Sequence, residues 1–289
     1  MRILLTGATG CLGSCIVRRL LRVGYEVICL KRSFSDMWRV KAIANDMEWV
    51  DVDAESIENV FKRHRHIDAV VHMATNYGRN GETAADIMQT NVMFPLEILQ
   101  WASFFHVDVF YNTDTLLGKN ISIYSLSKSN FSEWGKWFSE HRDIEFINLR
   151  IDHMYGENDA THKFIPYLID KFKQNVPEID LTEGNQKRDF IHLDDVVEAY
   201  LTVMEQSKRL SAYDVGSGTL TSIRQLAEML KKMTGASTRL NFGAIPYRKY
   251  EVMEPEVDIA PLRKLGWCPK VSLEDGLKRT VETYPWKRM

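Results

Sequence analysis

Tyr124 and Lys128, four residues apart in the stretch YSLSK, have the residue types and spacing for acid/base chemistry. Residues four apart lie on one face of a helix, so the lysine ammonium can approach the tyrosine hydroxyl. A free tyrosine has a pKa of about 10, and a neighbouring cation lowers that pKa because it favours the phenolate. The spacing therefore predicts a pair that exchanges a proton with a substrate, provided that its helix lies beside a bound cofactor.

A glycine-rich turn near the N-terminus predicts the cofactor. In TGATGCLG, three glycines lie between an apolar run and an amphipathic stretch. A strand, a tight turn and a helix N-terminus in this order can hold a pyrophosphate on free backbone amides. A dinucleotide site is therefore favoured over a merely structural turn. The candidate contacts from this turn are Gly7, Thr9, Gly10, Cys11, Leu12 and Gly13.

The end of the second apolar run indicates which dinucleotide is bound. An NAD site usually has an acidic residue there, whereas this chain has Lys31, Arg32 and Ser33 in ICLKRSFSD. Two cations and a hydroxyl suit a 2'-phosphate, so NADPH/NADP is predicted rather than NAD; the alternative is a solvated loop with ordinary surface charges. By position, further cofactor contacts are expected from Asp51, Val52 and Ala74.

The hydrophobic pattern predicts the elements that position these residues. Apolar runs of strand length alternate with amphipathic stretches, which indicates an α/β fold, a Rossmann-type doubly wound parallel sheet with helices on both faces. In the first amphipathic stretch, Leu12, Ile16 and Leu20 share one face, and Gly24 stands where a left-handed C-cap belongs. The apolar runs are residues 3–5, 27–30, 47–50, 69–73, 107–111 and 146–151.

This alternation loosens after about residue 155, which suggests a second lobe. The predicted dinucleotide-binding domain spans residues 1–155, with 188–216 returning to it. A smaller substrate lobe is predicted from residues 156–187 and 217–289, cupping the carboxyl edge of the sheet.

Composition narrows the classes of partner. Lys and Arg number 37 and Asp and Glu 39, for a net charge of -2, so no basic field exists to collect nucleic acid or anionic membrane. The first apolar run is too short for a signal peptide and no run reaches membrane-spanning length, so a cytoplasmic location is expected. The four cysteines form no C-x-x-C pair and are expected to fill the core, and no metal site is predicted.

With these motifs in place, the sequence resembles the extended short-chain dehydrogenases/reductases that act on nucleotide sugars. The resemblance covers nearly the whole chain and includes HMAT, NTDT, NLRIDHMYG, GNQKRDFIHLDDVVEAY, YDVGSG and RKLGWCPK. It implies that Thr113, Tyr124 and Lys128 form the catalytic core. The threonine would orient the substrate oxygen, the tyrosine would exchange its proton, and the lysine would lower the tyrosine pKa and hold the nicotinamide ribose. It also implies cofactor contacts from Asn91 and Ile151.

The same resemblance implies a nucleotide-diphosphate sugar as substrate. Arg188 and Arg248 match arginines that usually meet the phosphates and ribose of the nucleotide, and arginine supplies the planar, permanently charged donors that a diphosphate needs. For Arg188 the alternative is a salt bridge to Asp189 or Asp194. The other expected substrate contacts are Asn76, Thr113, Asp114, His153 and Lys163.

The two residues after Thr113 distinguish reactions within this family. Dehydratases carry Thr-Asp-Glu and use the two carboxylates as acid and base, whereas this chain has Thr113-Asp114-Thr115. A hydroxyl without an activating partner cannot replace the glutamate base, so dehydration is disfavoured. FYNTDTLL and RDFIHLDDVVEAYL are similar to the abequose synthase branch. That similarity implies NADPH-dependent reduction of the C4 ketone of a nucleotide-linked 4-keto-6-deoxy or 3,6-dideoxy hexose, for O-antigen deoxysugars.

Two other functions stay open. A nucleotide-sugar 4-epimerase uses the same tyrosine and lysine but keeps NAD permanently bound, which Lys31 and Arg32 argue against. A non-catalytic NADPH-binding sensor could share the fold. Against the sensor, Asn91, Thr113 and the tyrosine–lysine pair are all present.

A homodimer is expected from two stretches, residues 84–105 and 122–139, that carry apolar residues on more than one face. Helices of this kind bury a second surface. In the resembling family the equivalent pair packs against its twin as a four-helix bundle; burial under a local loop is the alternative. The aromatic residues concerned are Trp101, Phe104, Phe131, Trp134, Trp137 and Phe138.

Overall fold

The computed structural model describes residues 1–285, which divide into two compact units. The first unit comprises residues 1–150 and 206–213, and the second comprises residues 151–205 and 214–285. Segment 188–205, which the sequence analysis assigned to the first domain, groups with the second unit because its strand pairs there, as described below. Residues 286–289 of the predicted substrate lobe lie outside the described part of the chain.

A seven-stranded sheet in the order β10-β6-β5-β4-β1-β2-β3 carries the predicted cofactor turn. β1 pairs in parallel with β2 on one side and with β4 on the other, so the strand order reverses at β1. In open α/β sheets, ligands bind at the carboxyl ends of the strands beside such a reversal. The predicted doubly wound sheet is thus confirmed. The strands are β1 (Arg2–Thr6), β2 (Glu26–Lys31), β3 (Glu48–Asp51), β4 (Ala69–His72), β5 (Val109–Thr115), β6 (Glu145–Ile151) and β10 (Ala212–Val215).

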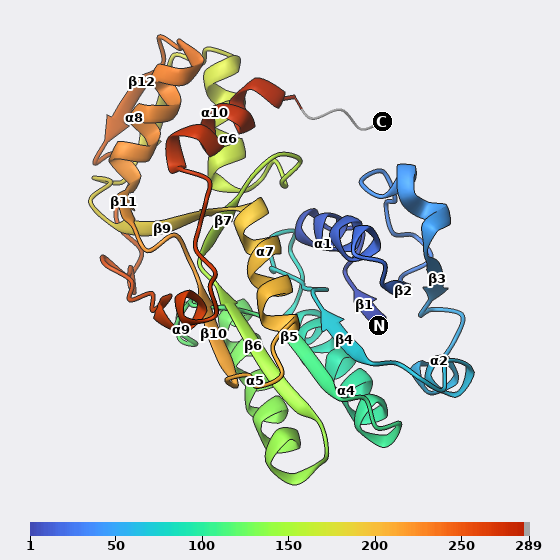
Figure 1. The fold of residues 1–289 in the computed structure, drawn as a ribbon. Helices are drawn as coiled ribbons and strands as arrows, with labels where there is room; N and C mark the ends of the chain where they lie inside the picture. The colour runs from blue at the N-terminus through green and yellow to red at the C-terminus, as the bar shows by residue number, and fades with distance from the viewer. Residues whose placement is uncertain (286–289) are drawn as a thin grey trace. The chain divides into compact units, whose positions relative to one another are not determined.

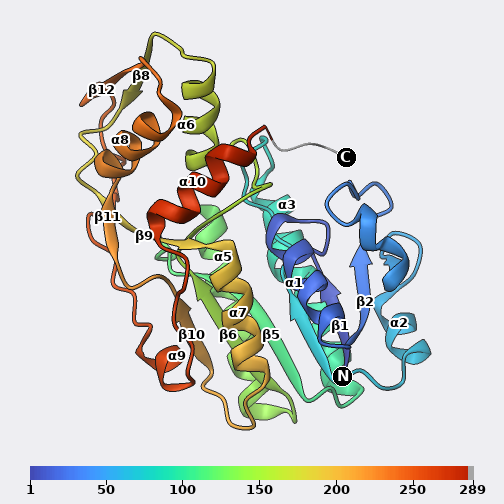
Figure 2. The same ribbon diagram turned by 45° about the horizontal axis from the view of Figure 1, so that its top comes forward.

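Helices cover both faces of this sheet (Figure 1 and Figure 2). α1 (Cys11–Arg22) packs on one face, while α2 (Ile57–Arg63), α4 (Phe94–Phe104) and α5 (Ile123–His141) pack on the other. The core under these three helices is rich in aromatic rings: Phe110 of β5 lies 5.8 Å from Phe131 of α5 and 5.6 Å from Phe146 of β6, centroid to centroid. The short 3-10 helix η1 (Lys41–Asp46) precedes β3.

α1 forms as its sequence predicts. Leu12, Ile16 and Leu20 are buried on one face. Gly24 has a φ of 83°, and the amides of Gly24 and Tyr25 bond back to the carbonyls of Leu21 and Leu20. This left-handed residue satisfies the last carbonyls of the helix, as expected for a glycine at that position.

A widened turn interrupts the next helical segment. α3 (Ala84–Met88) runs into the π-helical turn η2 (Gln89–Met93) and then into α4, without a break in the chain. Single π turns inside helices often accompany functional sites. Here the turn carries the buried Asn91, one of the predicted cofactor contacts.

The second unit has its own sheets and core. β9 pairs with β7 and β11 in one sheet, and β8 pairs with β12 in another. A core of apolar residues from α6, α8 and α10 stabilises it, with Leu168, Leu226 and Leu277 fully buried. Its elements are β7 (His153–Tyr155), α6 (Phe164–Lys173), β8 (Glu178–Leu181), β9 (Lys187–His192), α7 (Leu193–Met204), β11 (Leu220–Ser222), α8 (Ile223–Thr234), β12 (Arg239–Phe242), α9 (Ala260–Lys264) and α10 (Leu273–Thr283).

Over residues 1–285, none of the helices has both the length and the apolar character that a bilayer crossing requires.

Candidate active site

The turn between β1 and α1 brings three backbone segments very close together. Gly7 has a φ of 77°, and a Cβ atom there would lie 2.6 Å from the backbone nitrogen of Ala74. A Cβ atom at Gly13 would lie 2.1 Å from the carbonyl oxygen of Gly7. Larger side chains at these positions would push α1 away from the ends of β1 and β4. The glycines are therefore required by the geometry of the turn.

This turn leaves the start of α1 open to an anion. The helix begins at Cys11 with Gly10 as its N-cap, and a glycine has no side chain with which to cap the first turn. Amides at a helix N-terminus have no intrahelical partner, and with the helix dipole they favour a bound pyrophosphate. Thr9, Cys11, Leu12 and the three glycines thus form a cradle that fits a dinucleotide phosphate bridge.

Thr6 joins the ends of β1 and β4 beneath this cradle. Its hydroxyl oxygen accepts hydrogen bonds from the amides of Met73 and Ala74, each at 3.1 Å, and lies 2.8 Å from Nδ1 of His72. Because this oxygen already accepts two hydrogen bonds, the hydroxyl of Thr6 donates its proton in a hydrogen bond to Nδ1 of His72. Burial and the charge of Lys128 both lower the pKa of His72, so the imidazole is neutral.

The residues predicted to meet a 2'-phosphate have acidic neighbours. Lys31 forms an ion pair with Asp51, and the amide and hydroxyl of Ser33 both donate to Asp53, at 2.6 and 2.8 Å. The guanidinium of Arg32 packs 4.6 Å from the ring centroid of the exposed Phe34. Val52 and Ile151 are further predicted cofactor contacts. The amide of Val52, directly after β3, donates to the carbonyl of Lys31, and Ile151 is the buried last residue of β6.

Tyr124 and Lys128 lie in the first turns of α5, which has a clear start signal. Ser122 is the N-cap, and its side chain and that of Ser125 bond reciprocally to each other's backbone amides. Lys128 is only 2% exposed, and burial lowers its pKa to about 8. Asp114 opposes this shift, because its negative charge raises the pKa of Lys128. The ammonium of Lys128 is therefore surrounded by protein atoms and has almost no contact with water.

The pKa of Tyr124 is shifted in the direction opposite to the one expected from the spacing of Tyr124 and Lys128. Lys128 was expected to lower the pKa, but burial raises it well above its ordinary value, and the charges of Tyr77 and Asp114 raise it further. The side chain of Thr115 and the charge of Arg79 act in the opposite direction. The reason is desolvation, which disfavours a phenolate more than the nearby cations favour it.

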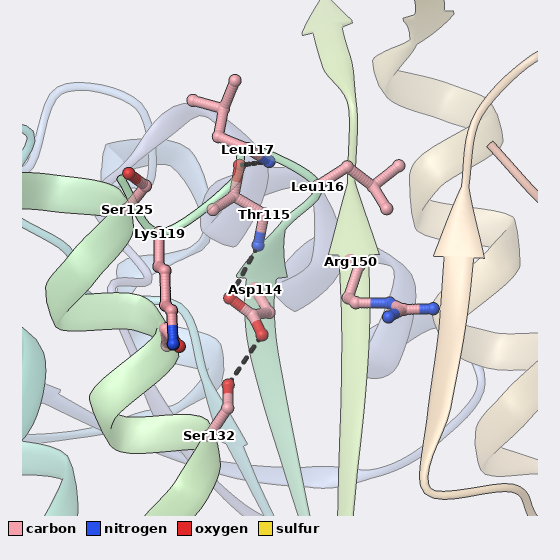
Figure 3. Close-up of a pocket in the computed structure, with 9 residues that line it drawn as sticks. Asp114, Thr115, Leu116, Leu117, Lys119, Ser125, Ser132 and Arg150 are labelled. Atoms are coloured by element: carbon pink, nitrogen blue, oxygen red, sulfur yellow. Dashed lines mark hydrogen bonds between the residues drawn. The ribbon is translucent and has the colours of Figure 1, made fainter. Parts of the chain in front are cut away.

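Asp114 is fixed by two hydrogen bonds. Its carboxylate accepts from the hydroxyl of Ser132 at 2.7 Å and from the amide of Thr115 at 2.8 Å, as Figure 3 shows. Ser132 also lies 3.4 Å from the amide oxygen of Asn148, which accepts a bond from Asn112 at 2.8 Å. The carboxylate is therefore part of a polar network between β5, β6 and α5.

Asn91 ties the loop after β4 to α5. Its side-chain oxygen accepts from the amide of Asn76 at 2.7 Å, and its nitrogen donates to the carbonyl of Asn76 at 2.8 Å and to the hydroxyl of Ser127 at 2.9 Å. Ser127 in turn donates to the carbonyl of Tyr124 at 2.7 Å. Asn91 thereby connects the segment carrying Asn76 to the helix that carries the tyrosine.

A polar cavity of about 290 Å³ opens at the end of β5, beside the network of Asp114. It was not anticipated from the sequence, although its three serines follow the helical spacing i, i+4, i+7 and could have been noticed. Figure 3 shows Ser125 and Ser132 on α5, opposite the end of β5, with Arg150 on β6. The lining residues are Asp114, Thr115, Leu116, Leu117, Lys119, Ser125, Ser129, Ser132 and Arg150.

In the second unit, three predicted substrate ligands have carboxylate partners. Arg188 pairs with Glu251, rather than with Asp189 or Asp194, and donates to the carbonyl of Val252 at 2.6 Å. The other pairs are Lys163 with Asp159 at 2.9 Å and His153 with Asp152 at 2.6 Å. Arg248 is exposed.

Chemically, the first unit combines a dinucleotide cradle with proton-exchanging groups. Thr113 at the end of β5 and Tyr124 and Lys128 of α5 supply a hydroxyl, a phenol and a cation. Residues 1–285 hold no group of three His, Cys, Asp or Glu that could bind a metal ion. The arrangement suits proton transfer to a substrate oxygen coupled to cofactor chemistry.

Comparisons with known proteins show the family of the chain. The sequence model of the NAD dependent epimerase/dehydratase family matches residues 3–216. The chain is 37% identical over 289 residues to the CDP-abequose synthase of Salmonella muenchen and 31% identical over 292 residues to that of Salmonella typhimurium, with 97% of each chain covered. It superposes with a TM-score of 0.86 on UDP-glucose 4-epimerase with UDP-glucose from Thermotoga maritima, at 26% identity and 98% coverage of both chains.

Replacing Lys128 by methionine should reveal the cost of burying the ammonium. Because burial lowers its pKa from 10.5 to about 8, the unfolded chain binds more protons than the folded chain between these values. The free energy of unfolding of the parent protein therefore rises with pH across that window. We expect Lys128→Met to be more stable than the parent by about 3 kcal/mol at neutral pH, and this difference to vanish as pH approaches the upper value.

Chemical denaturation at several pH values measures this difference. Lys136→Met, at an exposed lysine of the same helix, serves as the control and should show no such pH dependence. A Lys128→Met difference that stays constant with pH would mean that Lys128 is not buried as a cation.

Proposed function

Because the chain belongs to the NAD dependent epimerase/dehydratase family, we propose that it reduces the C4 ketone of a nucleotide-linked 4-keto-6-deoxyhexose, or of the 3,6-dideoxy analogue, with NADPH. The observation that carries this proposal is the identity of 37% to a CDP-abequose synthase over nearly the full length of both chains. Thr113, Tyr124 and Lys128 supply the groups that such a reduction needs. The product would be a deoxysugar for surface polysaccharide.

The residues of the chain would divide the reduction as follows. NADPH, when bound, supplies the hydride that becomes the new C–H bond at C4. Tyr124 gives its proton to the oxygen that becomes an alkoxide, and its raised pKa suits the role of acid. Thr113 donates a hydrogen bond to the same oxygen. Lys128 holds the nicotinamide ribose, and Gly7, Gly10 and Gly13 leave room for the pyrophosphate.

The end of β5 supports reduction over dehydration. A dehydratase needs a base for the proton at C5, and this chain has the hydroxyl of Thr115 at the position where such a base is expected. The one carboxylate of the segment, Asp114, is bonded to Ser132 and to the amide of Thr115. Thr115 and Asp114 therefore do not supply the acid/base pair that loss of water requires.

The nucleotide diphosphate would be bound by residues of the second unit. Arg188 is 12% exposed and paired with Glu251, and a phosphate would take the place of that carboxylate. Arg248, from the same stretch of chain as Glu251, is exposed and supplies a second guanidinium. Lys163, His153 and residues of the first unit, Asn76 and Asp114, are the further proposed substrate contacts.

Tyr124→Phe is expected to lower turnover with NADPH by at least about 100-fold, because the alkoxide loses its proton donor. The measurement is NADPH consumption against a panel of CDP-, dTDP- and GDP-linked 4-keto-6-deoxyhexoses, with the C4 configuration of the product read by NMR. Tyr167→Phe, at an exposed tyrosine of α6, is the matched control. Normal turnover by Tyr124→Phe would refute the mechanism. A parent protein that binds NADPH but oxidises none would favour the sensor.

Arg32→Ala is expected to weaken NADPH binding about 10- to 100-fold and to leave NADH binding nearly unchanged, because one charged hydrogen bond to the 2'-phosphate is lost. Arg32 is chosen because Lys31 and Ser33 are already engaged by Asp51 and Asp53. Titration of both cofactors by fluorescence measures the effect, with Arg22→Ala, an exposed cation at the far end of α1, as control. Equal losses for both cofactors would contradict a phosphate contact.

A 4-epimerase is the second candidate, since Asp51 pairs with Lys31 and Asp53 accepts from Ser33, which engages two of the three groups that would select a 2'-phosphate. The structural likeness to a UDP-glucose 4-epimerase points the same way. The two functions differ in their use of cofactor: an epimerase would convert a nucleotide sugar without added NADPH and without net oxidation. Assay of UDP-glucose in the absence of added cofactor separates them.

A homodimer through α4 and α5 is proposed from the aromatic residues exposed on these helices. Phe104 is 68% exposed, Trp134 46% and Trp137 41%. Large apolar side chains that are exposed to this extent favour burial against a second surface. Trp134→Glu is expected to convert a dimer to a monomer, read by size exclusion with light scattering. Val23→Glu, at an exposed apolar residue beyond α1, is the control, and a parent protein that runs as a monomer would refute the dimer.

A further inference from the structure

Arg39 is a cation beside the glycine turn that was not among the predicted cofactor contacts. Its guanidinium donates a hydrogen bond to the carbonyl of Thr9, with 3.4 Å between Nη1 and the oxygen. Thr9 belongs to the turn from Gly7 to Gly13 that forms the phosphate cradle. Arg39 itself comes from the segment after β2, so its side chain connects the loops that follow the first two strands.

Several contacts fix the position of Arg39. Arg18 of α1 donates a hydrogen bond to the carbonyl of Arg39, and Val40, the next residue, is fully buried. The guanidinium of Arg39 lies 4.3 Å from the centroid of the Trp38 ring, and the amide of Trp38 donates to the carboxylate of Asp36 at 3.1 Å. Backbone and guanidinium are therefore both held in place by the protein itself.

These contacts place the guanidinium at the carboxyl edge of two adjacent strands. β1 and β2 pair in parallel, with Thr6 opposite Leu30, and the loops that carry Thr9 and Arg39 follow directly after them. In a dinucleotide fold, the ribose that carries the adenine binds at the end of the second strand, and an arginine near it accommodates a 2'-phosphate. Because Arg39 reaches Thr9, it lies between that position and the pyrophosphate cradle.

The two cations at the end of β2 are arranged differently from Arg39. Lys31 is paired with Asp51, so a phosphate would have to displace a carboxylate there. Arg32 is exposed and packs on the exposed ring of Phe34. Arg39 is half-buried and held by Trp38 and the glycine turn. A planar donor that is already in position loses less conformational entropy when it binds a phosphate.

We propose that Arg39 is a specificity-determining residue that binds the 2'-phosphate of NADPH. A guanidinium carries several N–H donors in a planar fork, so it can keep its bond to Thr9 while other donors bind the phosphate in a bidentate manner. NADH has a hydroxyl in place of this phosphate, so the contact distinguishes the two cofactors. The inference rests on the use of NADPH proposed above.

Titration of both cofactors by fluorescence, without substrate, tests this contact. Arg39→Met keeps an unbranched side chain but removes the charge. We expect it to weaken NADPH binding about 10- to 100-fold and to change NADH binding by less than about twofold. Arg39→Lys keeps the charge but loses the planar fork, so its NADPH affinity should lie between those of the parent and Arg39→Met. Lys41→Met removes an exposed cation two residues further on and should bind both cofactors as the parent does.

Equal losses of NADPH and NADH affinity in Arg39→Met would overturn the 2'-phosphate contact, because a turn that has only lost its support would weaken both cofactors. Unchanged NADPH affinity in this variant, or a parent protein without preference for NADPH, would overturn it as well. Adenosine 2',5'-bisphosphate and AMP, as competitors, test the contact without the nicotinamide: the parent should prefer the bisphosphate, and Arg39→Met should lose that preference. A parent that binds NADPH through Arg39 but reduces no 4-keto sugar would refute the proposed reduction alone.

Discussion

The buried ammonium of Lys128 is the constraint around which the site is organised. A cation that is 2% exposed must be offset by nearby negative charge or lose its proton, and Asp114 supplies that charge. The carboxylate can do so only because Ser132 and the amide of Thr115 fix it between β5 and α5. The same helix is tied to the loop after β4 through Ser127 and Asn91. Tyr124 lies one turn before the lysine on the same helix, so these bonds also fix the position of its backbone.

Three of the cations proposed to bind ligand share a second feature, because a carboxylate already faces each of them. Arg188 has Glu251, Lys163 has Asp159, and Lys31 has Asp51. A buried or half-buried cation without a partner would cost free energy, so the protein supplies an anion of its own. Binding of a phosphate at such a position is an exchange of one anion for another. The affinity then depends on the difference between two similar interactions, which favours selectivity over strength.

The features that could be predicted from the sequence are those encoded by residues close together in the chain. The turn from Gly7 to Gly13, the helical spacing of Tyr124 and Lys128, and the alternation of apolar runs each need only a short window of sequence. The partners of Arg188 and Asp114 needed the fold, since Glu251 is 63 residues from the arginine and Ser132 is 18 from the aspartate. The raised pKa of Tyr124 also needed the fold, because burial cannot be read from spacing. The assignment of 188–205 to the first domain depended in the same way on an unseen strand pairing.

The π turn at Gln89–Met93 has a consequence for the sequence changes that this fold can accept. Each residue added to or removed from a helix rotates everything beyond it by about 100°. Removing one residue here would convert the π turn to an ordinary helical turn, and Asn91 would lose its buried position. It would also rotate α4, which would move the buried Ile98 and Leu99 toward the surface and the exposed Phe104 toward the core. Insertions and deletions should therefore be absent from this helix in working relatives. Length, more than composition, is what this segment must preserve.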